Sequence, residues 1–275
     1  MREGDHTHDT WHVRVVHAEA GNQSLPMIVK RIPSQVTAAV EIACGLAARE
    51  LRFNVPMAGL VVAERDDLPG LDNQVLGERF LLVGSHYQHP DALFAEVVNG
   101  NPAAESLIWD SLCATNVGRQ GAAWDELIAN PDRHCENVLF DGTTWWLFDH
   151  DQALEPAASF AKNSDNQTIR LDAIAFNAAE NQLAEHLIRR YSGQLQAIMD
   201  QIKRLDTGGK RLQTLAHYAR DWSHPDAEIH HVLQLIGVIL GLIHLRLPAQ
   251  AEKLQQRLVP GKASFATWTS PKRKL

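Results

Sequence analysis

The sequence predicts a bilobal α+β fold, with a small β-rich N-terminal part at residues 1–88 and a larger, mainly helical part at residues 89–275. Three observations predict it. The first 90 residues hold short apolar and β-branched runs separated by turn residues, which is typical of strands. After that, apolar residues recur at helical spacing. The change falls near residues 84–90, which we take as the boundary.

The N-terminal part is predicted to begin with a β-hairpin. WHVRVVHA (11–18) alternates apolar and polar residues, turn residues follow, and LPMIVKRI (25–32) returns as a second strand. A helix is expected over 36–53, because apolar residues recur at helical spacing and a proline follows soon after. MAGLVVAE (57–64) and RFLLVGS (79–85) then predict two more strands.

The C-terminal part is predicted to be helical, apart from one hairpin. The expected helices cover residues 90–99, 102–117, 122–130, 179–205, 210–222 and about 225–247. Residues 157–167 (AASFAKNSDNQ) are polar and poorly periodic, and predict a mobile loop. The uncharged run at 232–245 is shorter than the roughly 20 apolar residues that cross a bilayer, so a buried core helix is expected there.

Composition excludes several classes of function. The formal charge is −7 and the pI is about 6.0, so no general affinity for nucleic acid or for an anionic membrane is expected. Three scattered cysteines, Cys44, Cys113 and Cys135, make no CxxC pair and no disulfide framework. The N-terminus lacks the apolar core of a signal peptide. A cytoplasmic location is therefore expected.

The stretch NPDRHCENVLFDGTTWWLFDHDQ (130–152) carries the candidate chemistry. Asp-Gly between two apolar runs is a strong hairpin signal. If Phe140 pairs with Trp145, Asn137 lies opposite Phe148, and Asp149 follows at the same open end of the hairpin. Asp132 lies on the loop that leads into the first strand, within reach of the same point.

These three polar residues suit a phosphoryl-transfer site. Carboxylate and amide oxygens are ligands that Mg²⁺ prefers, and its other ligands come from water and phosphates. Phosphoryl transfer also needs a carboxylate that orients the attacking hydroxyl. We therefore interpret Asp132 as the catalytic residue, and Asn137 and Asp149 as metal ligands. Asp and Asn are also common turn and cap residues, and the spacing alone leaves that alternative open.

WDELIANPDRHCENVLFDGTTWWLFDHD resembles the catalytic segment of HipA-like kinases, in which D-R-H-x-x-N precedes a hairpin with an Asp on its returning strand; phosphatidylinositol kinases carry a similar motif. LPMIVKRI and the helix after it look like the family's nucleotide-binding strand and next helix. The resemblance implies a protein-kinase-like fold, with ATP and Mg²⁺ as cofactors. Lys30 would contact the α and β phosphates, Glu41 would pair with Lys30, and the backbone of the strand segment Leu82, Val83 and Gly84 would face adenine.

Two features differ from the family pattern. Only Gly4 and Gly21 precede Lys30, so the phosphate-covering element is either GDHTHDT (4–10) or an abbreviated loop. The stretch before Lys30 is also too short for the extra N-terminal subdomain of full-length HipA. The sequence therefore gives no support for a toxin pairing of the HipA type.

The leading hypothesis is an ATP- and Mg²⁺-dependent kinase that phosphorylates a protein Ser or Thr, with autophosphorylation as a further expectation. A small-molecule or lipid-head-group kinase would use the same site. A nucleotide-binding pseudokinase that serves as an interaction module is the alternative from another class, supported by the missing Gly-rich loop. The presence of Asp132, Asn137 and Asp149 together argues against that module.

Overall fold

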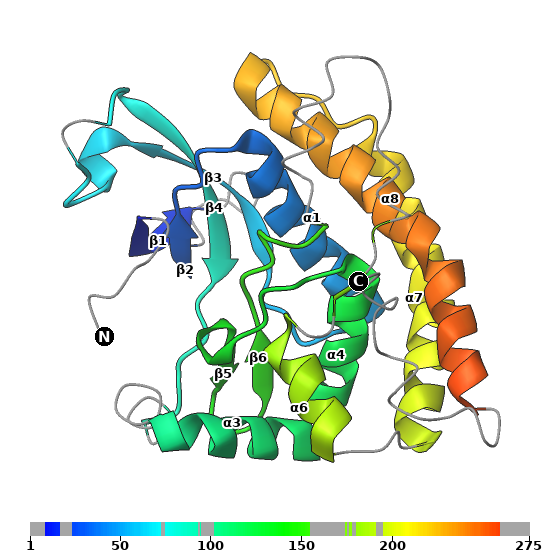
Figure 1. Ribbon diagram of the computed structural model, residues 1–275. Coiled ribbons are helices and arrows are strands. Elements are labelled where there is room, and N and C mark those ends of the chain that lie inside the picture. Colours follow the sequence, from blue (N-terminus) through cyan, green and yellow to red (C-terminus); the bar gives the residue numbers. More distant parts are fainter. Residues whose placement is uncertain are drawn as a thin grey trace, which may run out of the picture.

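A computed structural model of the chain describes residues 9–16, 24–72, 75–92, 94, 102–154, 174, 176–177, 180–190 and 195–258 (Figure 1). Its elements are β1 (Thr10–Val16), β2 (Ser24–Lys30), α1 (Gln35–Leu51), β3 (Ala58–Glu64), the 3-10 turn η1 (Arg65–Asp67), β4 (Arg79–His86), α3 (Pro102–Ala114), α4 (Asn116–Ile128), the 3-10 turn η2 (Cys135–Asn137), β5 (Val138–Phe140), β6 (Trp145–Leu147), α6 (Gln182–Arg190), α7 (Leu195–Ala219) and α8 (Ala227–Leu258). An antiparallel sheet comes first and helices dominate after it, so the α+β class is confirmed.

The N-terminal sheet has the strand order β1-β2-β4-β3 and is antiparallel throughout. β1 and β2 form the predicted hairpin, with Thr10 opposite Lys30. β4 runs between β2 and β3, which makes it a central strand. Gly84 of β4 is required by packing, because a Cβ there would lie 2.7 Å from Cγ2 of Val61 and 2.8 Å from Cε of Met27.

Helix α1 is buried between the sheet and the C-terminal helices, and Figure 1 shows it between the sheet and the α7–α8 pair. Ser34 caps its start by accepting a hydrogen bond from the backbone of Thr37, as N-cap serines do. Arg52 ends it in the left-handed conformation, with φ 62°. Most of the helix is buried, including Glu41, which therefore has a fixed position in the interior.

Several helical boundaries differ from the prediction. The helix expected over 102–117 ends at Ala114, because Thr115 starts a new helix by accepting a hydrogen bond from the Gly118 backbone. Of the helix expected over 179–205, the structure describes α6 as far as Arg190 and α7 from Leu195, and α7 continues through the segment predicted separately at 210–222 as far as Ala219. Two of the sequence expectations, most of the helix at 90–99 and the loop at 157–167, lie outside the described residues.

Helix α8 extends eleven residues beyond its expected end at Leu247, and Pro248 lies inside it. Leu254, beyond the proline, is fully buried, so packing against the core supports the last turns. An 18-residue window within Ala227–Gln256 reaches a mean hydropathy of 1.8, which matches a membrane span in length and composition. Packing explains this composition equally well, because 56% of the window is buried and the helix packs along α1 and α7.

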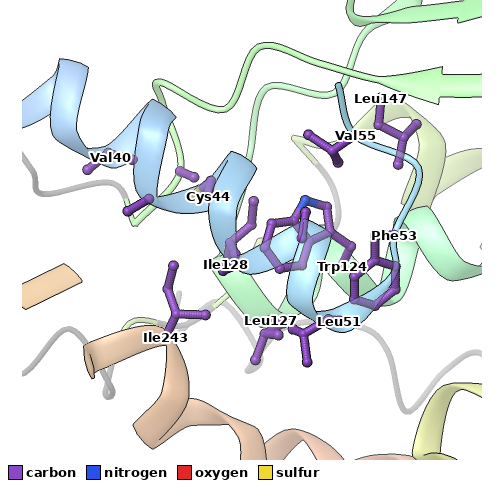
Figure 2. Close-up of a cluster of buried hydrophobic side chains, with 14 of the residues drawn as sticks. Val40, Cys44, Leu51, Phe53, Val55, Trp124, Leu127, Ile128, Leu147 and Ile243 are labelled. Atoms are coloured by element: carbon purple, nitrogen blue, oxygen red, sulfur yellow. The ribbon is translucent and has the colours of Figure 1, made fainter. Parts of the chain in front are cut away.

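The largest hydrophobic core joins both parts of the chain. Figure 2 shows Trp124 of α4 among Leu51 at the end of α1, Phe53 just after it and Ile243 of α8. The rings of Phe53 and Trp124 lie 5.2 Å apart, in the range of favourable aromatic contacts. Leu147 of β6 belongs to the same core, so the short hairpin that carries the candidate site is anchored in the interior.

Candidate active site

Hairpin β5–β6 has the predicted register. Phe140 pairs with Trp145, and the Phe148 backbone N–H donates to the carbonyl of Asn137 at 3.2 Å. Asp141 stabilises the turn, because its carboxylate accepts hydrogen bonds from the Trp146 indole at 2.7 Å and from Thr143 and Thr144. These bonds, that of Trp146 first, lower the pKa of Asp141 well below its usual range. Asn137 and Asp149 therefore lie at the same open end of a fixed hairpin.

A buried ion pair holds the loop in front of this hairpin. Arg133 and Asp125 both have fully buried side chains, joined by two hydrogen bonds of 2.9 Å and 3.2 Å. Nη1 of Arg133 also donates to the carbonyls of Asn137 at 2.8 Å and Phe148 at 2.5 Å. One guanidinium thus ties the loop to α4 and to both strands of the hairpin. Sequence reasoning assigned no role to either partner, although Arg133 is part of the D-R-H-x-x-N motif.

Two buried asparagines complete this network. Asn130 and Asn181 each donate to the Asp125 carboxylate, at 3.2 Å and 3.0 Å. Asn181 also donates to the carbonyl of Asn130 at 3.0 Å, and Oδ1 of Asn130 accepts from the backbone N–H of Asp132 at 3.1 Å. A buried charge is tolerated only when hydrogen bonds surround it, and here these bonds also fix the backbone of the predicted catalytic residue.

Asp132 presents a half-exposed carboxylate to the site. Its Oδ2 lies 3.8 Å from Nε2 of His134. Partial burial raises the pKa of Asp132, the charge of His134 opposes this rise, and the nearby carboxylates of Asp149 and Asp151 add to it. A carboxylate of raised pKa that solvent reaches is suited to accept a proton.

The side chain of Asn137 is oriented by a hydrogen bond to the catalytic loop. Its Nδ2 donates to the carbonyl of Asp132 at 2.7 Å, and the residue is buried. Because the nitrogen is engaged, the amide oxygen is the atom that is left for a metal ion. Asn137 stays a predicted metal ligand, with its amide oxygen as the atom that would bind the ion.

Lys30 of β2 reaches the hairpin end directly. Its Nζ lies 2.5 Å from Oδ1 of Asp149 and 3.0 Å from Oδ2 of Asp151. Burial would lower the pKa of Lys30, but the charges of Glu41, Asp149 and Asp151 outweigh burial and raise it. Asp149 itself has φ 58°, a conformation that Asp tolerates better than most residues and that recurs at functional sites.

The expected direct ion pair between Glu41 and Lys30 needs correction. The Glu41 carboxylate accepts a hydrogen bond from the backbone N–H of His150, and it acts on Lys30 through its charge alone. Burial raises the pKa of Glu41 to about 7, while Lys30 opposes the rise and Asp149 and Asp151 add to it. Lys30 takes Asp149 and Asp151 as its direct partners instead, and sequence reasoning did not single out Asp151.

His150 lies between these two aspartates in sequence, with its ring in the core. Burial lowers the pKa of His150 well below its usual value, and the charges of Arg133 and Lys30 lower it further, so the ring is neutral. It packs edge-on against Trp124, with ring centroids 6.0 Å apart. The imidazole thus serves as a buried packing group beneath the site.

The expected role of Leu82, Val83 and Gly84 also needs correction. All three pair with β3, and Val83 and Gly84 pair with β2 on the other side as well. The backbone groups of Val83 and Gly84 are therefore used by the sheet on both sides and do not face a ligand, whereas the role expected for Leu82 stays a prediction. The strand ends at His86, whose N–H donates to the Met57 carbonyl. The sequence does not reveal the order of strands in the sheet, so it could not show that β4 has a neighbouring strand on each side.

The donor set fits a magnesium ion better than a transition metal. No three His, Cys, Asp or Glu side chains gather as a metal-binding cluster anywhere in the part of the chain that the structure describes. Asn137 and Asp149 offer one amide oxygen and one carboxylate, and Mg²⁺ commonly keeps several waters and uses few protein ligands.

Comparisons with known proteins identify no family. No family model and no curated protein matches the chain. Among solved structures, the Helicobacter pylori proinflammatory kinase CtkA is 11% identical, with a TM-score of 0.35 over 87% of this chain and 97% of that chain. A likeness of this size does not decide the function.

Proposed function

We propose that the chain is an ATP- and Mg²⁺-dependent phosphotransferase of the HipA-like type. The observation that carries this proposal is the contact between Lys30 and Asp149. It brings the only lysine of β2 to the end of the hairpin, beside the catalytic loop. The D-R-H-x-x-N resemblance of residues 132–137 supports the same conclusion.

Each residue then has a distinct task in the transfer. Asp132 orients the acceptor hydroxyl and takes its proton, as the raised pKa and exposure of its carboxylate allow. Lys30 binds phosphate oxygens of the nucleotide, and Asn137 and Asp149 hold the magnesium ion that neutralises the phosphate charge. The adenine meets the segment that follows His86, where the chain leaves the sheet.

A protein Ser or Thr is the proposed acceptor, and the chain itself is the first candidate substrate. This part of the proposal rests on the resemblance to HipA-like kinases. A small alcohol or a lipid head group would need the same base and metal, so the acceptor is determined by comparing these classes in one assay.

The test is transfer of label from γ-labelled ATP in the presence of Mg²⁺. Wild type should label itself or an added protein. Asp132→Asn should lower the rate by about 10²–10⁴-fold, the usual contribution of a general base. Glu136→Gln is the matched control, because it removes one exposed carboxylate from the same loop and should keep the wild-type rate. Equal labelling of wild type and Asp132→Asn would contradict the proposal. ATP binding with no labelling of any acceptor class would favour a nucleotide-binding module.

A further inference from the structure

The lysine of the site has two carboxylate partners, and they differ in their surroundings. Asp149 has 36% of its side chain exposed, whereas Asp151 has 6% exposed and lies 3.0 Å from Nζ of Lys30. Gln152 donates to the other carboxylate oxygen of Asp151 at 3.2 Å. Asp151 is therefore the more enclosed of the two partners.

The more exposed partner is also the proposed metal ligand. If Asp149 binds Mg²⁺, its carboxylate faces a divalent cation and the Lys30 ammonium together, and these two positive charges repel each other. The bond from Lys30 to Asp149 is then weakened when nucleotide and metal bind. Asp151 stays available to Lys30, because its contact with the ammonium uses a separate carboxylate.

Glu41 does not supply the direct contact. Its carboxylate is held by the His150 backbone N–H, on a helix whose burial fixes its position. We propose that Asp151, rather than Glu41, is the positioning residue that aims Lys30 at the nucleotide phosphates. This inference rests on the proposed function. Glu41 instead holds the backbone between the two aspartates.

The two possible effects of Asp151 on the transfer rate have opposite signs, so Asp151→Asn can tell positioning of Lys30 from the effect of the Asp151 charge alone. A carboxylate near a triphosphate repels it, so an Asp151 that acted only through its charge would slow transfer, and Asp151→Asn would raise the rate. If Asp151 positions Lys30, the same substitution releases the ammonium and lowers the rate. A displacement of about 1 Å in a positioned group costs up to about a hundredfold.

The experiment is a double-mutant cycle on the rate of label transfer, with wild type, Asp151→Asn, Lys30→Met and the double variant. Asp151→Asn should lower the wild-type rate by about ten- to a hundredfold. In the Lys30→Met background it should change the rate less than about twofold, because there is no ammonium left to aim. Glu41→Gln should lower the rate less than Asp151→Asn does, and Asp151→Glu should recover part of the loss.

A second cycle with the same four proteins measures the free energy of unfolding without nucleotide. The effects of Lys30→Met and Asp151→Asn should not add, because the two side chains are in contact. The inference fails if wild type transfers phosphate and the two effects on rate multiply, or if Asp151→Asn is as active as wild type. It also fails if Glu41→Gln is the more damaging variant. If wild type transfers no phosphate, the proposed function fails and the inference falls with it.

Discussion

Nζ of Lys30, at the end of β2, lies 2.5 Å from Oδ1 of Asp149, at the end of hairpin β5–β6, although 119 residues separate them in sequence. The contact joins the N-terminal sheet to the helical part at one point. The hairpin is anchored in the core through Leu147, and β2 is held in the sheet on both sides. Both residues of the contact therefore have fixed positions. A site that positions phosphates requires such fixed side chains.

Replacing Lys30 by Met should lower the transfer rate strongly, to a residual rate that can still be measured, and should also destabilise the protein. Removal of one member of a buried ion pair lowers the free energy of unfolding by about 3–5 kcal/mol. Because Asp149 is partly exposed, we expect a smaller loss of about 2 kcal/mol for Lys30→Met. Urea unfolding at pH 8 measures it. Lys253→Met is the control, because Lys253 is exposed and lies 3.8 Å from Glu126, and it should cost less than about 1 kcal/mol. Equal losses of unfolding free energy for Lys30→Met and Lys253→Met would contradict a stabilising ion pair at Lys30.

Asp149→Asn should change the magnesium requirement, and Asp151 leaves Lys30 with a second carboxylate partner. Removing the carboxylate weakens metal binding, so the Mg²⁺ concentration at half-maximal transfer should rise about tenfold or more, the fold-change expected when about 1.4 kcal/mol of binding free energy is lost. A magnesium titration of the transfer rate measures this. Glu136→Gln should keep the wild-type midpoint, since its carboxylate lies on the exposed side of the loop. An unchanged midpoint for Asp149→Asn would remove this residue from the metal site.

Arg133→Lys should be among the most destabilising substitutions in the site. Lysine keeps the charge but cannot bridge Asp125 and the carbonyls of Asn137 and Phe148 at once. Leaving buried partners unpaired should lower the free energy of unfolding by about 3–5 kcal/mol. Arg79→Lys is the matched control, because Arg79 pairs with Asp226 at the surface and should cost less than about 1 kcal/mol. A small loss for Arg133→Lys would show that the loop is held by other contacts.

Local patterns predicted the hairpin β5–β6 and the strand that carries Lys30 correctly. The register of Phe140 with Trp145 depends on an Asp-Gly turn between apolar runs, and such a signal is contained within a few residues. The α+β class follows from a change of hydrophobic period, which is also local. These features needed no knowledge of how distant segments pack.

Features that depend on distant packing could not be predicted in this way. In sequence, Asp125 is one acid on a helix and Arg133 one basic residue in a loop, and only the fold shows that both are fully buried and paired. The central position of β4 likewise depends on strand order, which overturned the expectation for Gly84. The sequence likewise does not show that Asp151 contacts Lys30 directly while Glu41 accepts from the His150 backbone, because that depends on how distant segments pack.

Glu41 should make stability depend on pH below neutrality. Burial raises its pKa from 4.5 to about 7, so between these values the folded protein binds a proton that the unfolded chain has released. The contribution of Glu41 to the free energy of unfolding is thus fully present below about pH 4.5 and is lost as the pH rises to about 7.

Glu41→Gln has no proton to lose, and its amide oxygen can still accept a hydrogen bond from the His150 N–H. The free energy of unfolding of Glu41→Gln should therefore rise relative to wild type across this window, as measured by urea unfolding at several pH values. Glu50→Gln, on the same helix with a partly exposed side chain, controls for the loss of one carboxylate. Parallel pH profiles for wild type and Glu41→Gln would mean that Glu41 is charged throughout this range, held so by Lys30.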